Sequence, residues 1–145
     1  MKKIIRLALL PGIFTAAILF VGCSNSRKID YELQEKCAKD AAAMFKADFA
    51  DNPLYPGADY EDHYSKKLNK CFMLLTAMLP STDFKNPVIQ KYLFDVNENH
   101  LCATADYRSS SGLYSWTIEN GNEKEGGLGK FQAAWQPFIK DKMEN

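Results

Sequence analysis

The histidines, together with the acidic and hydroxyl side chains near them, are the residues whose types and spacing could do chemistry. Asp59 and His63 stand four positions apart, so on a helix they would share a face and offer two metal ligands, but only His100 remains as a third. Asp62, His63 and Ser65 are the residue types of nucleophilic hydrolysis, yet neighbours along one helix point in different directions and form no relay. We therefore expect no catalytic residue, no metal and no other cofactor.

Helical spacing dominates the first half of the sequence. Residues 30–50 carry apolar side chains at intervals of three and four, which predicts a helix that ends before Asn52-Pro53. A second helix is expected over residues 59–79, because acidic residues occupy its first turn and Pro80 follows its last. Its apolar stripe would consist of Tyr60, Tyr64, Leu68, Cys71, Leu75 and Met78.

Three polar side chains of this predicted second helix lie off the apolar stripe: His63, Lys67 and Lys70. Acidic residues are interspersed among the lysines, which favours a solvated helix face over a site for anionic headgroups. We expect these three side chains on the surface, where they would form an interaction surface.

Two of the cysteines, Cys37 and Cys71, lie on the apolar stripes of the two predicted helices. The stripes would face each other if the helices form a hairpin, so we expect a disulfide between these two residues. It closes a loop of about 35 residues, worth about 4 kcal/mol in the chain-entropy model. Cys102 is then left over, as a buried thiol, a reactive thiol or a link to another chain.

Period-two alternation replaces helical spacing in the second half of the chain. A four-residue turn over residues 97–100 would place Phe94 opposite Ala103 on the apolar face of a hairpin. The expected fold class is α+β, with a disulfide-linked helical hairpin, a three-stranded antiparallel meander and a C-terminal helix. The strands are expected at residues 91–96, 101–106 and 114–118, and the last helix at residues 130–143.

The start of the chain reads as a secretion signal. Lys2, Lys3 and Arg6 precede an uncharged apolar run over residues 7–22, and no acidic residue appears before Asp30. A helix of this run would span roughly 24 Å, short of the roughly 30 Å hydrocarbon core of a bilayer. A permanent membrane-spanning helix is therefore the weaker interpretation.

The end of the apolar run, Leu19-Phe20-Val21-Gly22-Cys23, resembles the lipobox of bacterial lipoproteins. The resemblance implies cleavage before Cys23, a diacylglycerol on its thiol and a further acyl chain, such as palmitate, on its amine. Several buried acyl chains make such an anchor stable. Ser24 stands where the family's inner-membrane retention signal usually has Asp, which implies the outer membrane if the host is diderm. The alternative is an ordinary signal peptide that is cut elsewhere.

The leader also sets the domain organisation and the charge of the mature chain. We expect a signal peptide over residues 1–22, a lipidated tether over 23–29 and a single α+β domain over 30–145. Without the leader, the 18 basic residues fall by 3 to 15 against 18 acidic residues, a net charge of −3. This charge argues against nucleic acid as a partner, and the oligomeric state stays open.

A second resemblance concerns residues 60–72, which read YEDHYSKKLNKCF. Together with residues 35–39, EKCAK, this segment resembles a group of small bacterial lipoproteins. The group shares a Cys-bearing first helix and a Tyr-x-x-His-Tyr-x-x-Lys-Leu-Asn-Lys-Cys-Phe second helix. The resemblance supports the expected disulfide and fold, and it implies no activity.

Two classes of function follow from these observations. The first is a noncatalytic envelope lipoprotein that is held to the membrane by its lipid and binds an envelope protein or component. The second is a small envelope hydrolase or ligand-binding protein, whose cleft is built from residues scattered along the sequence. A structure with His63 or His100 in a pocket beside a buried carboxylate would favour the second class over the first.

Overall fold

A computed structural model describes residues 22–79, 87–108, 110–119 and 121–144, and it confirms the α+β class. The strands form one antiparallel sheet in the order β1 to β6, so each strand pairs with its neighbours in sequence. The expected three-stranded meander corresponds to β3, β4 and β5 of this larger sheet. In chain order the elements are α1 (Gly22–Asp48), β1 (Asp59–Ser65), β2 (Lys70–Leu79), β3 (Val88–Asp95), β4 (His100–Arg108), β5 (Leu113–Ile118), β6 (Lys124–Gly126) and α2 (Leu128–Met143).

The predicted second helix, and with it the helical hairpin, is wrong. Residues 59–79 form the β1–β2 hairpin, in which Tyr60 pairs with Leu75. Residues 71–75 of β2 are all buried, because α1 packs on one face of this strand and α2 on the other. A strand that is buried on both faces shows no alternation, and its apolar run cannot be distinguished by period from a buried helix.

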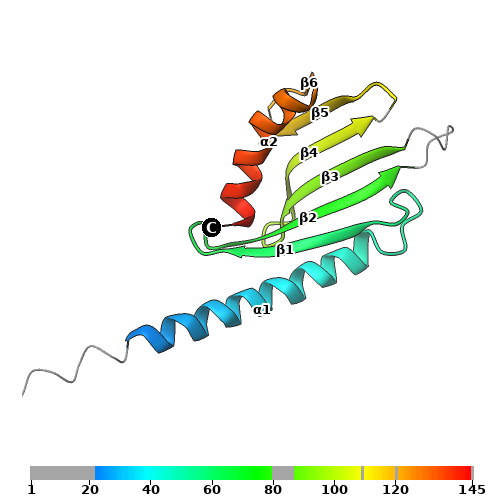
Figure 1. The fold of residues 1–145 in the computed structure, drawn as a ribbon. Helices are drawn as coiled ribbons and strands as arrows, with labels where there is room; N and C mark the ends of the chain where they lie inside the picture. The colour runs from blue at the N-terminus through cyan, green and yellow to red at the C-terminus, as the bar shows by residue number, and fades with distance from the viewer. Residues whose placement is uncertain (1–21, 80–86, 109, 120, 145) are drawn as a thin grey trace, which may run out of the picture.

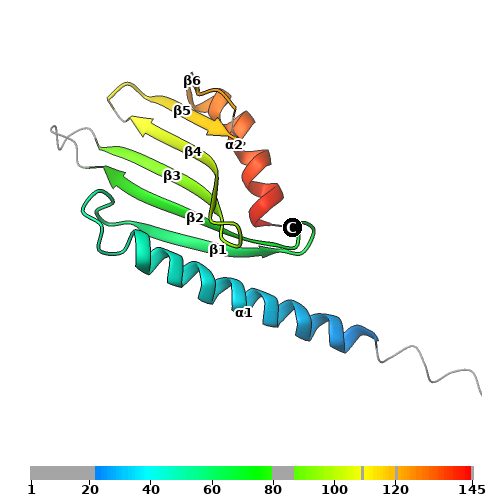
Figure 2. The ribbon, with the colours of Figure 1, turned by 180° about the vertical axis from the view of Figure 1, so that it is seen from behind.

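Helix α1 runs along the β1 edge of the sheet (Figures 1 and 2). Ala41 and Phe49 pack with Met73 and Leu75 of β2. The helix begins at Gly22, earlier than the expected residue 30, and ends near the predicted position. Gly22 is the only residue of the predicted signal peptide within the described part of the chain.

The side chain of Gln34 on α1 covers the free edge of β1. Its Nε2 donates to Oδ2 of Asp62 at 3.0 Å, and its Oε1 accepts the backbone N–H of Tyr64 at 2.9 Å. Unpaired backbone groups on an edge strand otherwise invite pairing with another chain. α1 therefore provides hydrogen-bond partners for part of this free edge, and it also covers apolar side chains of the sheet.

Helix α2 covers the opposite face of the sheet and crosses it from β6 towards β1 (Figure 1). This confirms the expected C-terminal helix, which also contains Pro137. Among the described residues, no helix is long and apolar enough to cross a membrane. The core beneath α2 consists of Phe72, Leu74, Leu93, Ala103, Ala105, Trp116, Phe131 and Trp135.

Candidate functional site

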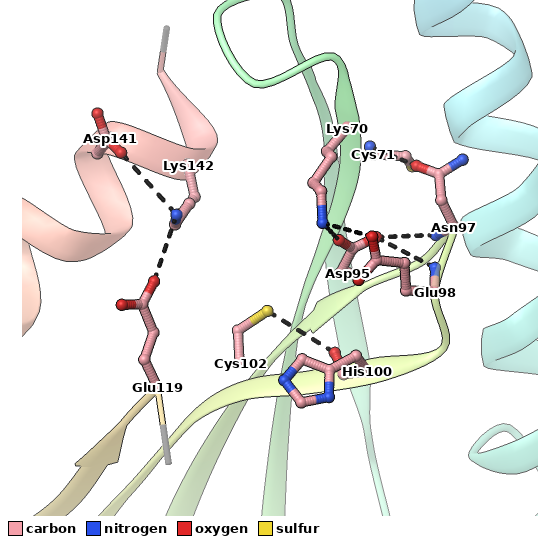
Figure 3. Close-up of polar contacts among 10 residues, drawn as sticks. All are labelled: Lys70, Cys71, Asp95, Asn97, Glu98, His100, Cys102, Glu119, Asp141 and Lys142. Atoms are coloured by element: carbon pink, nitrogen blue, oxygen red, sulfur yellow. Dashed lines mark hydrogen bonds and ion pairs between the residues drawn. The ribbon is translucent and has the colours of Figure 1, made fainter. Parts of the chain in front are cut away.

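A pocket of about 320 Å³ opens where the β1–β2 turn, the β3–β4 turn and the last turn of α2 meet. Leu68, Phe72 and Cys102 form its apolar floor, and Figure 3 shows the charged side chains of its lining. These residues come from four separate parts of the chain, which the antiparallel sheet and the return of α2 bring together. The lining consists of Leu68, Lys70, Phe72, Asp95, Glu98, His100, Cys102, Glu119 and Lys142.

Asp95 builds one side of this pocket by shaping the β3–β4 turn. Its Oδ1 accepts the backbone N–H groups of Asn97 at 3.1 Å and Glu98 at 3.2 Å. This is the local bonding by which an Asp initiates a turn. The turn is tied to β2, because Oδ1 of Asn97 accepts the backbone N–H of Cys71 at 2.8 Å.

Lys70 is the counter-charge shared by the two carboxylates of this turn. Its Nζ lies 2.6 Å from Oδ2 of Asp95 and 2.8 Å from Oε1 of Glu98. The Asp95 side chain is only 2% exposed, so it depends on these partners, since a buried carboxylate without a counter-charge is costly. Hydrogen bonds to Asp95 and then to Glu98 raise the pKa of Lys70 above its ordinary range. Lys70 is therefore charged throughout the physiological range.

Lys142 of α2 forms the other side of the pocket. Its Nζ lies 3.5 Å from Oε1 of Glu119 and 4.0 Å from Oδ2 of Asp141. It also stands 5.7 Å from the ring centroid of Phe72 and 5.4 Å from that of Phe138. These distances allow cation–π attraction, so the floor of the pocket already accommodates an ammonium group.

Cys102 reaches the pocket through a β-bulge. The expected pairing of Phe94 with Ala103 is wrong, because Phe94 pairs with Leu101 and Leu93 with Ala103. The residue between them, Cys102, is the extra one, and it packs beside the core under α2. Its Sγ lies 3.8 Å from the backbone oxygen of His100, between the lysine sites in the view of Figure 3.

Burial controls the chemistry of this free thiol. It raises the pKa of Cys102 above the ordinary thiol value. Because the thiolate is the nucleophile, the protonated form that burial favours is the less reactive one. The thiol therefore acts as part of the apolar floor.

The structure separates the residue types that suggested hydrolysis. β1 directs His63 and Ser65 to one face and Asp62 to the other, where it binds Gln34. Nε2 of His63 and Oγ of Ser65 are buried and have no hydrogen-bond partner within the described residues. Ser65 has no exposed surface, so its hydroxyl cannot meet a substrate.

The suggested metal pair also lies on a strand instead of a helix. Asp59 and His63 are four residues apart on β1, a separation of about 13 Å, too far for one ion. Across the part of the chain that the structure describes, no group of three or more His, Cys, Asp or Glu side chains could hold a metal ion.

The predicted interaction residues occupy three different environments. Lys67 forms an ion pair with Asp141 of α2, and Lys70 belongs to the pocket described above. His63 is half-buried on β1. The side chain of Cys23, the predicted lipidation site, lies outside the described residues.

Sequence patterns gave no sign of most of the pocket. Asp95 precedes the predicted β3–β4 turn, and an Asp at the start of a turn could have indicated its role. Glu119 and Lys142 come from remote segments, and only the course of α2 brings them to β2. The chain was also compared with protein families, curated proteins and solved structures, and no family model, curated protein or solved structure matches it.

Proposed function

We propose that this chain is a lipid-anchored, noncatalytic binding protein of the bacterial cell envelope and that the pocket beside Lys70 contacts its ligand. The leader and the lipobox-like end at Cys23 support the anchor. The pocket supports binding, since it combines an apolar floor with a small number of charged groups that can orient a ligand.

The condition that favours the alternative class is met, because His100 lines a pocket that also contains the buried Asp95, its pairing partner in the β3–β4 hairpin. The carboxylate of Asp95, however, is engaged by Lys70 and by two backbone N–H groups. This arrangement supports ligand binding over hydrolysis, because a general base needs a group that orients it.

The observation that carries the proposal is the pairing of both pocket lysines with carboxylates. Lys70 is held by Asp95 and Glu98, and Lys142 lies near Glu119. Groups engaged in this way can recognise charge, whereas acid–base catalysis requires a group that can exchange protons near neutral pH.

Site-specific photo-crosslinking in intact cells tests the proposal. A photoreactive amino acid at position 100 samples the pocket mouth, and one at the exposed position 51, after α1, serves as the matched control. We expect a distinct crosslinked product from position 100 that position 51 does not give. The same products from both positions would contradict the assignment of the pocket as the contact site.

A further inference from the structure

The exposed rim of the pocket is acidic. Glu98 and Glu119 are 60% and 62% exposed, and they stand on opposite sides of Cys102 in Figure 3. Counting the buried Asp95, three carboxylates face the ammonium groups of Lys70 and Lys142, which leaves the lining with one net negative charge if His100 is neutral. A cation is thus favoured over an anion at the mouth.

Lys142 shows how an alkyl ammonium group fits this site. Its side chain is only 16% exposed, and its Nζ lies above the rings of Phe72 and Phe138 while facing Glu119. A long aliphatic stem over an apolar surface with a charged head at an acidic rim is the usual placement of a partly buried lysine. Lys142 is therefore itself a basic side chain of the kind that the pocket favours.

An anionic ligand would meet the opposite situation. Both lysines already have carboxylate partners, so an anion would have to displace Asp95 or Glu119 and would then face the remaining acidic groups. A basic side chain, in contrast, can share a glutamate with its lysine, because the ion pairs with Lys70 and Lys142 engage Oε1 of Glu98 and Glu119, and a carboxylate has two oxygens that accept several hydrogen bonds.

We propose that the pocket binds a lysine or arginine side chain of a partner polypeptide, with its aliphatic stem along the half-buried Leu68 and Cys102 and its charge between Glu98 and Glu119. This inference rests on the proposed binding function and names the chemistry of the ligand. Lys142 is the resident competitor for the same acidic rim.

Titration of the isotope-labelled mature protein in detergent micelles tests this assignment by NMR. The probes are the acetyl-methylamide derivatives of lysine, norleucine and glutamate. We expect the lysine derivative alone to shift the backbone amide signals of Glu98, Cys102 and Lys142. Equal shifts with norleucine, or stronger shifts with glutamate, would overturn the proposal.

Variants separate recognition from a purely structural role. Glu98→Gln and Glu119→Gln should each weaken lysine binding about two- to fivefold, the range for partly exposed ion pairs, while Glu125→Gln on β6 should not. Lys142→Met should strengthen binding by a similar factor, because it frees Glu119 and removes a positive charge. Weaker binding in Lys142→Met, in a protein whose other amide signals are unchanged, would contradict the competitor role.

Two outcomes distinguish this inference from the function on which it rests. A product crosslinked specifically from position 100, together with no preference for lysine, would overturn only the basic-ligand assignment. Selective lysine binding without a crosslinked partner would count against the binding function in cells. Tighter binding of spermidine than of the lysine derivative would overturn the assignment to a polypeptide.

Discussion

Cys37 of α1 and Cys71 of β2 form a disulfide, with their Cα atoms 5.3 Å apart. The bond fixes the helix to the second strand of the sheet, close to the turn that builds the pocket. Cys71 also pairs through its backbone with that turn, since the N–H of Val96 donates to the oxygen of Cys71 at 2.9 Å. Helix, sheet and pocket are therefore connected through one residue.

Removal of this disulfide should lower stability substantially. Replacing both Cys37 and Cys71 with Ala should reduce the free energy of unfolding by about 2–5 kcal/mol, because the unfolded chain gains conformational freedom. Urea unfolding of the two proteins measures the difference. A nonreducing peptide map of the wild type should contain one peptide that links Cys37 and Cys71. A peptide linking Cys71 to Cys102 would contradict the structure.

The disulfide was predictable from sequence even though one of its two elements was not. Cys37 and Cys71 both stand among apolar residues, and buried positions of adjacent elements meet whether those elements are helices or strands. The identity of β2 could not be obtained in this way, because an apolar run buried on both faces has the same pattern in a helix. The bulge at Cys102 and the approach of Lys142 to Phe72 depend on tertiary packing, which periodicity does not report.

Lys70 should contribute to stability, unlike an ordinary surface lysine. Lys70→Ala leaves the buried carboxylate of Asp95 without its cation, and we expect a loss of about 1–3 kcal/mol. Lys66→Ala is the matched control, since Lys66 pairs with Asp30 on the surface, and it should cost at most about 1 kcal/mol. Equal effects of the two substitutions, measured by urea unfolding, would argue against the role assigned to Lys70.

The contribution of Lys70 should also depend on pH. Its pKa is raised in the folded state, so its stabilising effect is complete below the ordinary lysine value of about 10.4. The effect is lost as pH rises through the higher folded value. The difference in unfolding free energy between wild type and Lys70→Ala should therefore stay constant from about pH 6 to 9 and shrink above about pH 10.4. A difference that grew with alkaline pH would have the wrong sign.

Leucines at two depths of the sheet should respond differently to truncation. Leu93 has no exposed surface and lies under α2, so Leu93→Ala should cost about 2–5 kcal/mol through lost transfer energy and a cavity. Leu101 is 40% exposed, and Leu101→Ala should cost about 0.5 kcal/mol or less. Leu68, which the sequence pattern placed in the core, is only half-buried in the β1–β2 turn. The loss of stability caused by Leu68→Ala should therefore lie between the losses caused by the other two substitutions. Thermal and urea unfolding of the three variants would reveal any departure from this order.

Cys102 should alkylate slowly in the folded protein. Burial raises the pKa of its thiol, so the reactive thiolate is scarcer than in a free cysteine at the same pH. The rate of reaction with iodoacetamide should reach its midpoint above the ordinary thiol value of about 8.5. The same protein in concentrated urea with the disulfide intact is the control, and its rate should follow the ordinary value. A folded protein that reacts as fast as the unfolded one at pH 7 would place the thiol outside the apolar floor.

The proposed lipid anchor makes its own prediction. Cys23 follows an apolar run and Gly22 in the arrangement that resembles a lipobox, so the acyl chains should be attached to this residue. Cells given a fatty-acid probe should label the wild-type protein, and Cys23→Ser should abolish the label because a serine hydroxyl does not replace the thiol that accepts the diacylglycerol. Cys102→Ser serves as the control for the loss of a cysteine at a different position, and it should label as the wild type does. Label that persists in Cys23→Ser would show that acylation occurs elsewhere, whereas an unlabelled wild-type protein that is still secreted would indicate an ordinary signal peptide.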